Sequence, residues 1–305
     1  DTTGKKLLEK DYNEITGLET GNGEVLFKLK QKALYGFYNP LTQKTVTPAF
    51  FDIEHLDATP LLKVSYQEKN GLYNTAGEQL LPAEYSSFSF LHGPFLAVKK
   101  YSGAGLYNLQ TKKEIIPAAY YRVEALPGNS SFFTAEVEVA GDANLYGIFN
   151  DKGAQAVPPV YSNIREIGKA YYLLLSQKNN TAHYALFNGH TGRLTPLPFR
   201  EADVSGEPGL LIVNDGRNSY LWDAATRKPA SALYPLRDNG EGYTPVAALS
   251  PFVSGLCAVV KAGKTGFINA RGEVVIPFVY DDARMQKNGA IMLMKQDGGN
   301  WLYGY

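Results

Sequence analysis

Residues 264–280 read KTGFINARGEVVIPFVY and contain the pattern that recurs along the chain. The glycine, aromatic residue and isoleucine near its start predict a short β-strand, with the glycine placed where no side chain fits. Asn269 and Gly272 then predict a turn, because asparagine bonds to nearby backbone groups and glycine accepts a left-handed conformation. The β-branched run that follows predicts a second strand, which Pro277 ends, and Tyr280 begins a third.

The pattern returns with a period of roughly 38 residues, which is typical of repeat architectures. In six copies an aromatic residue follows the proline by three positions, and an asparagine precedes that proline by eight or nine. The six aromatic residues are Phe51, Tyr85, Tyr120, Tyr161, Phe199 and Tyr280. A degraded seventh copy lies at residues 220–223, where Asp223 replaces the asparagine, and residues 237–252 after it are interpreted as an inserted loop.

The two ends of the chain complement each other. Residues 301–305 have the pattern of a first strand, whereas residues 6–9 and 12–15 have the patterns of a second and a third. Pairing these segments would close a ring and remove the exposed sheet edges. Since no amphipathic helix of about ten residues is visible, we predict one all-β domain over residues 1–305. We expect a β-propeller-like closed ring of about eight small blades. An open β-solenoid of hairpin units is the alternative, and seven blades result if the degraded copy merges with its neighbour.

The composition excludes several classes of protein. Thirty basic and thirty acidic residues balance, so no charge pattern indicates nucleic acid or an acidic membrane surface. No apolar run approaches the ~18 residues of a membrane span. Cys257 is the only cysteine and lies in an apolar run, so it is expected to be buried and no intramolecular disulfide can form. We expect a monomer.

The repeat resembles the bacterial WG-repeat family, whose units read roughly Gly-Trp/Tyr-Gly-Phe/Ile-Ile-Asp/Asn, a turn glycine, Val-Ile-Pro and a tyrosine. The closest matches are residues 145–150 (LYGIFN) and 264–269 (KTGFIN). The tryptophan that names the family is mostly Tyr, Asn, Ala or Thr here, so the chain is identified as a divergent member. The resemblance implies a binding or scaffolding module of bacterial envelope or secreted proteins, and it brings no catalytic residue set. We therefore expect a periplasmic, cell-surface or secreted location, with the cytoplasm as the alternative.

Motifs for chemistry are missing from the sequence. The four histidines have no metal-ligand spacing; they are His55, His92, His183 and His190. Neither a Gly-x-Ser-x-Gly elbow nor a phosphate loop occurs. Asp281 and Asp282 form a carboxylate pair, but their place after the repeat tyrosine favours a solvated strand start over a glycosidase pair. We predict no catalytic, cofactor-binding or metal-binding residue and no enzymatic activity.

We expect a binding or scaffold protein for an unknown protein or peptide partner. The alternative is a carbohydrate-binding module that uses surface aromatic residues, and a propeller glycosidase is a third hypothesis. Aromatic residues at fixed repeat positions are expected to fill the space between blades. Residues that depart from the repeat are better candidates for function, and these are Tyr101, His183, Trp222, the insertion at residues 237–252 with Tyr243, and Trp301.

Overall fold

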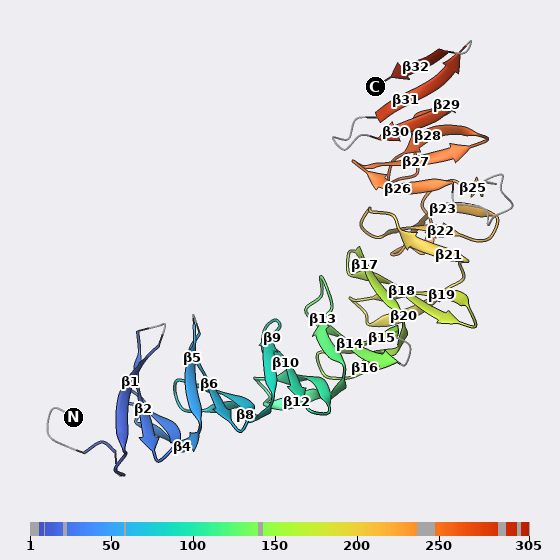
Figure 1. Cartoon of the computed structure of the whole chain (residues 1–305). Helices are drawn as coiled ribbons and strands as arrows, with labels where there is room; N and C mark the ends of the chain where they lie inside the picture. The colour runs from blue at the N-terminus through green and yellow to red at the C-terminus, as the bar shows by residue number, and fades with distance from the viewer. Residues whose placement is uncertain are drawn as a thin grey trace. The chain divides into compact units, whose positions relative to one another are not determined.

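The computed structural model describes residues 6–8, 10–20, 23–57, 59–139, 143–236, 248–285, 291–297 and 300–304, with side chains left out at 143, 284–285, 297 and 300–304. Throughout this part of the chain the regular structure is β-strand, and no helix occurs in it (Figure 1). The strands form eight small antiparallel sheets. The prediction of an all-β fold of about eight repeated units is confirmed at this level.

Each sheet is built from strands that are consecutive in the sequence. The first contains β1 (Glu14–Glu19), β2 (Val25–Gln31), β3 (Leu34–Asn39) and β4 (Lys44–Phe50); the second β5 (Asp52–Leu56), β6 (Leu61–Tyr66), β7 (Lys69–Asn74) and β8 (Gln79–Tyr85). The third contains β9 (Ser87–Phe90), β10 (Phe95–Lys100), β11 (Gly103–Asn108) and β12 (Lys113–Tyr120); the fourth β13 (Arg122–Ala125), β14 (Phe132–Val139), β15 (Ala143–Asn150) and β16 (Gln155–Tyr161).

The remaining sheets follow the same order with two irregularities. The fifth contains β17 (Asn163–Gly168), β18 (Tyr171–Lys178), β19 (Thr181–Asn188) and β20 (Arg193–Leu197). The sixth contains β21 (Glu201–Val204), β22 (Leu210–Asn214), β23 (Asn218–Asp223) and two short strands that both pair with β23, β24 (Lys228–Pro229) and β25 (Tyr234–Pro235). The seventh contains β26 (Leu249–Val253), β27 (Leu256–Lys261), β28 (Lys264–Ile268) and β29 (Val274–Tyr280), and the eighth β30 (Asp282–Met285), β31 (Ile291–Asp297) and β32 (Asn300–Gly304).

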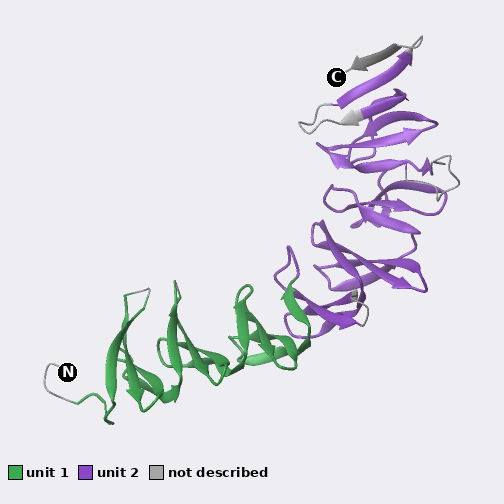
Figure 2. Ribbon diagram, viewed as in Figure 1, with its two compact units in different colours: residues 1–125 green, residues 126–305 purple. Residues whose placement is uncertain are grey.

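The chain divides into two compact units, Asp1–Ala125 and Leu126–Tyr305 (Figure 2). Within each unit, apolar side chains of consecutive sheets pack against one another. Leu26 and Phe37 of the first sheet, for example, share a core with Leu62 and Val64 of the second. The core therefore lies between sheets, as expected for stacked repeats in which a single sheet cannot bury its own apolar face. That residues 1–305 form one domain stays a prediction.

The glycine of the repeat faces a bulge in the next strand. Between the pairs Ala104–Tyr120 and Leu106–Ile116, β12 advances four residues while β11 advances two. A Cβ atom on Gly105 would lie 2.5 Å from the carbonyl oxygen of Ile116. The same close approach to backbone occurs at Gly36, Gly71, Gly147 and Gly266. These positions therefore need glycine because the bulged backbone occupies the space of a side chain.

In two copies that lack this glycine, the strand that pairs with the glycine position is different. Ala185 stands at the glycine position of β19, and its partner strand β20 pairs in regular register and ends at Leu197. Tyr220 stands at the glycine position of β23, and the strand opposite is split into β24 and β25. A side chain at this position thus goes together with the loss of the bulge.

The bulge also corrects two predictions about strand ends. The proline was expected to end the second strand and the following tyrosine to begin a third. Instead β12 continues through Pro117 and ends at Tyr120, and β29 continues through Pro277 and ends at Tyr280. Proline is tolerated there because it lacks an N–H group and the bulge already interrupts the ladder of hydrogen bonds.

The repeat aromatic residue of the first copy is Phe50, and the assignment of Phe51 was wrong. Tyr35 pairs with Phe50 as Asn70 pairs with Tyr85 in the next copy. Phe50 is 7% exposed, whereas Phe51 is 50% exposed. The proline of this copy lies one residue later in the bulge, so counting from the proline misplaced the aromatic residue by one position.

The predicted turn at the repeat asparagine is confirmed. The Oδ1 atom of Asn150 accepts the N–H groups of Lys152 at 3.0 Å and Ala154 at 2.8 Å. Asn269 likewise accepts the N–H groups of Arg271 and Glu273. One side chain therefore satisfies two donors of the turn, which explains why asparagine is the residue that opens it.

The predicted strands at the ends of the chain are found in part. β1 and β32 agree with the third-strand and first-strand patterns, whereas residues 6–8 form no strand and Glu9 lies outside the described residues. Among the described strand pairs, β32 pairs with β31 and none joins the first and eighth sheets. Ring closure stays a prediction.

Candidate functional site

The structure gives different roles to the residues that depart from the repeat. Tyr101 is fully exposed in the turn between β10 and β11, and His183 is exposed on β19. Trp222 is 7% exposed, and its ring lies 5.5 Å from that of Phe199 in the core between the fifth and sixth sheets. Trp222 therefore contributes to packing. Tyr243 and most of the predicted insertion, residues 237–247, lie outside the described part, as does the side chain of Trp301.

Other candidate residues for chemistry take part in local structural contacts. His55 shares a hydrogen bond of 2.7 Å with the Thr59 carbonyl, and the backbone of His190 lies in the turn opened by Asn188. Asp281 forms an ion pair with Lys264 and accepts the N–H of Gln296 at 2.8 Å. These contacts lower the pKa of the Asp281 carboxyl, the Lys264 hydrogen bond most of all. Over the described residues, no group of three or more His, Cys, Asp or Glu side chains could hold a metal ion.

Cys257 is fully buried between the sixth and seventh sheets, as predicted. Burial raises the pKa of its thiol to about 12, although a backbone hydrogen bond at Ser250 opposes this shift. Because only the thiolate attacks alkylating reagents, we expect native protein to resist maleimide at pH 8 for hours. Protein unfolded in urea should be labelled within minutes, as followed by mass spectrometry. Fast labelling of the native protein would contradict the buried position.

A polar network joins the second and third sheets in the first unit. The Tyr85 hydroxyl donates to Glu114 Oε2 at 3.0 Å, and Lys100 Nζ lies 2.9 Å from the same oxygen. Glu114 Oε1 accepts the N–H of Ala118 in the β12 bulge at 2.9 Å. Burial opposes ionisation of Glu114, but the hydrogen bonds from Lys100, Ala118 and Tyr85 together lower its pKa. The network therefore anchors a bulge and is interpreted as structural.

This network predicts a loss of stability in acid. The pKa of Glu114 is lower in the folded state than its ordinary value of 4.5, so its contribution is present above that pH and is lost as the pH falls through the folded value. At pH 7 Glu114→Gln should cost about 2 kcal/mol in urea denaturation. At pH 3 the difference from wild type should shrink. Glu84→Gln, at a more exposed neighbour of Lys100, should cost less, and an equal Glu114→Gln cost at both pH values would contradict the assignment.

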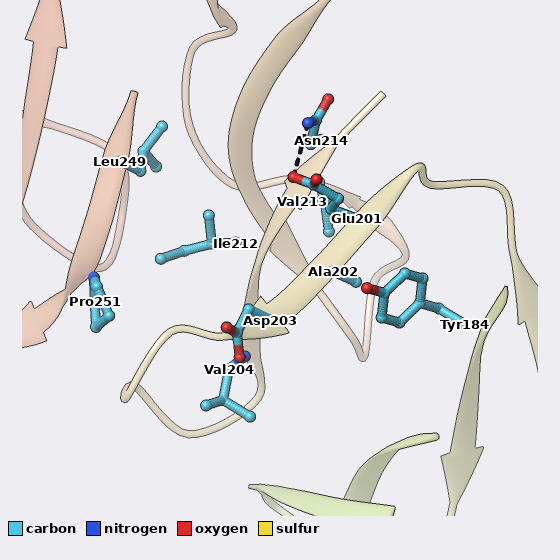
Figure 3. Close-up of a pocket in the computed structure, with 10 residues that line it drawn as sticks. All are labelled: Tyr184, Glu201, Ala202, Asp203, Val204, Ile212, Val213, Asn214, Leu249 and Pro251. Atoms are coloured by element: carbon cyan, nitrogen blue, oxygen red, sulfur yellow. Dashed lines mark hydrogen bonds between the residues drawn. The ribbon is translucent and has the colours of Figure 1, made fainter. Parts of the chain in front are cut away.

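The second unit contains an open cavity of about 330 Å³ around β21 (Figure 3). We call it the β21 cavity. Its lining residues come from β19, β21, β22 and β26, and they are Tyr184, Glu201, Ala202, Asp203, Val204, Ile212, Val213, Asn214, Leu249 and Pro251. β21 is an end strand of the sixth sheet and pairs with β22. The cavity thus lies where a sheet edge meets the two neighbouring sheets.

The alternation of side chains along β21 gives the cavity two walls. Glu201 and Asp203 lie on the face that also carries their partners on β22, Asn214 and Ile212. Figure 3 shows Leu249 and Pro251 of β26 across from this face. Ala202, on the other face, belongs to the core shared with the fifth sheet, against which Tyr184 packs.

The polar groups of the cavity are held in place. Asn214 is 4% exposed; its Nδ2 donates to Glu201 Oε2 at 3.0 Å, and its Oδ1 accepts the N–H of Gly216 at 2.7 Å. Asp203 Oδ1 accepts from Arg165 Nη1 at 2.6 Å and from the N–H of Val204 at 2.6 Å. The cavity therefore combines apolar walls with two oriented carboxylates, which sequence reasoning did not select because neither belongs to a motif.

One part of the chain matches a known family. The model described as WG containing repeat matches residues 266–301. The match shows a WG-containing repeat in this segment. It begins at Gly266, the repeat glycine of the seventh sheet, and runs through β29 and β31 into β32. The WG repeat thus spans the boundary between two sheets. Its first two strands, β28 and β29, are the last two strands of the seventh sheet, and its next strands belong to the eighth.

No curated protein sequence matches the chain. Similar solved structures include a eukaryotic initiation factor, with 13% identity over 88% of this chain and 78% of that chain and a TM-score of 0.32. Kluyveromyces lactis Hsv2 has 10% identity over 93% and 98% with a TM-score of 0.28, and the AfRom2 CNH domain has 9% over 82% and 92% with a TM-score of 0.26. No helix in the described residues is long and apolar enough to span a membrane.

Proposed function

We propose that this WG-repeat chain is a non-enzymatic binding or scaffold protein that recognises a protein or peptide partner through the β21 cavity. The supporting observation is the cavity itself, which is open, has apolar walls and carries the oriented carboxylates of Glu201 and Asp203. Binding sites are generally concave and mostly apolar, with a few placed polar groups. Its volume of about 330 Å³ suits one or two side chains of a partner.

The strand edge favours insertion of a side chain over addition of a strand. Asp203 accepts the N–H of its neighbour Val204, so this N–H is not available to the backbone of a strand added at the edge of β21. Charged side chains at edge strands hinder pairing with another chain. Tyr184 points its hydroxyl toward Ala202 (Figure 3) and packs against the core between the fifth and sixth sheets, so its ring is only partly available to stack on a sugar.

A carbohydrate-binding function is the second candidate, and a separate surface supports it. Tyr101 and Tyr121 are exposed at one end of the third sheet, next to the β10–β11 turn, since Tyr120 pairs with Ala104 at the start of β11. Exposed aromatic rings can stack on sugars. Binding of Tyr101→Ala and wild-type protein to a glycan array would distinguish this candidate from peptide binding.

We further propose that the protein has no enzymatic activity. A glycosidase acid would need a raised pKa. Among the described carboxyls whose pKa departs from its ordinary value, the pKa is lowered in each case; these are Asp52, Glu78, Glu114, Asp215 and Asp281. We propose a bacterial cell-envelope or secreted location, on the family resemblance.

We also propose that the repeat closes into a ring through residues 6–9. Leu8 and Tyr12 have the same spacing as Leu81 and Tyr85, which lie on β8 of the second sheet. Closure would protect sheet edges. Removal of residues 1–10 should then lower the Tm and cause concentration-dependent association in light scattering, and unchanged behaviour would argue for an open array.

The peptide-binding proposal can be tested with a displayed random peptide library. Selected peptides should bind wild type in fluorescence anisotropy and lose at least about tenfold in affinity, or ~1.4 kcal/mol, with Glu201→Trp, which fills the cavity. Glu54→Trp is the control, because Glu54 is an exposed carboxylate on β5, the corresponding strand of the second sheet. Failure to enrich any peptide, or equal binding by both variants, would overturn the proposal.

A further inference from the structure

We infer that the β21 cavity selects a basic side chain of the partner, lysine or arginine, and that Glu201 determines this specificity. The inference rests on the proposed peptide-binding function. Its basis is the difference between the two carboxylates of the cavity, which lie two residues apart on the same face of one strand. One of them already has a cationic partner in the protein.

The charge of Asp203 is balanced by Arg165. Their atoms Oδ1 and Nη1 lie 2.6 Å apart, in an ion pair between β17 and β21. For Glu201 the described part of the chain provides a hydrogen bond from the neutral amide of Asn214 and no ion pair. The cavity therefore carries one carboxylate charge that a bound cation could balance.

Glu201 is oriented before a ligand arrives. Asn214 holds its Oε2, and Asn214 is itself buried and anchored by the N–H of Gly216. A carboxylate held in this way loses little side-chain freedom on binding, so more of the interaction appears as affinity. A cation bound at the other carboxylate oxygen would add a hydrogen bond of the stronger, charge-assisted type.

The walls match the rest of a basic side chain. Ile212 and Leu249 form apolar surface beside the carboxylate face. Lysine and arginine carry an aliphatic stem that packs on such surface while the charged end stays with polar partners. A glutamate side chain would meet Glu201 with the same charge and be rejected.

The experiment uses one peptide from the library selection and changes only its anchor residue, the residue whose side chain enters the β21 cavity. Versions with lysine, arginine, norleucine and glutamate at that position are titrated against the full chain by fluorescence anisotropy. Lysine and arginine should bind at least about tenfold more tightly than norleucine, and the glutamate version more weakly still. Raising the salt concentration should reduce the preference.

The matched variants assign the effect to Glu201. Glu201→Gln keeps the shape of the side chain but removes its charge, so it should bind the lysine and norleucine versions with similar affinity. Glu54→Gln should keep the preference. If peptides bind wild type without preference for a basic residue, or if Glu201→Gln retains it, this inference fails while peptide binding stands. If no peptide binds, the proposed function fails as well.

Discussion

Gly105→Ala should destabilise the protein by about 3 kcal/mol, because even one added carbon has no space at this position. The new Cβ would lie 2.5 Å from the Ile116 carbonyl oxygen and 2.8 Å from the Ala118 nitrogen. Both are backbone atoms of the β12 bulge, so neither can turn away as a flexible side chain would. The bulge would have to move, and with it the contact between Ala118 and Glu114.

The fifth sheet supplies the converse control. Ala185 stands at the same repeat position, but its partner strand has no bulge, so Ala185→Gly should cost only about 1 kcal/mol, the entropic penalty of glycine in a strand. Urea denaturation followed by circular dichroism measures both. A Gly105→Ala protein as stable as wild type would show that the bulge is not what requires glycine.

Trp222→Ala should cost about 3–5 kcal/mol, the range for deleting a large buried aromatic side chain. Trp222 is almost fully buried between the fifth and sixth sheets, and its ring packs edge-on against Phe199 at 5.5 Å. The cavity left by alanine would remove contacts on both sheets. We expect a lower urea midpoint and, if the two sheets unfold together, an unchanged slope.

Tyr101→Ala is the comparison for this variant. Tyr101 also departs from the repeat, but it is fully exposed in a turn, so its removal should change stability by less than about 0.5 kcal/mol. Trp222 and Tyr101 both depart from the repeat, but Trp222 packs in the core and Tyr101 is exposed to a ligand. A large loss with Tyr101→Ala would contradict this separation.

The sequence predicted much of the local structure. Glycine, asparagine and β-branched residues at fixed spacing identified β7, β11 and β28 and the turns after them, since backbone conformation and short-range hydrogen bonds depend on neighbouring residues. The burial of Cys257 followed from its apolar surroundings. Strand ends were predicted less well, because proline usually ends a strand and the sequence does not reveal a bulge that accommodates it.

The candidate site could not be predicted in the same way. Glu201 and Asp203 are ordinary exposed carboxylates in the sequence, and their importance comes from Arg165, 38 residues away, which balances one and not the other. Asn214 gains its role only when β22 pairs with β21. Contacts between different sheets are set by packing, which a single repeat does not encode.

The sequence alone established a repeated all-β chain, because a period of roughly 38 residues with strand and turn signals has no helical interpretation. Tertiary structure determined which aromatic residue fills the core and where a cavity opens. Phe50 is buried and Phe51 exposed because β3–β4 pairing sets the register, and the β21 cavity forms because three sheets meet at a strand edge. The repeat determines which consecutive strands pair, whereas the role of a residue that departs from the repeat depends on the residues that it contacts in the folded structure.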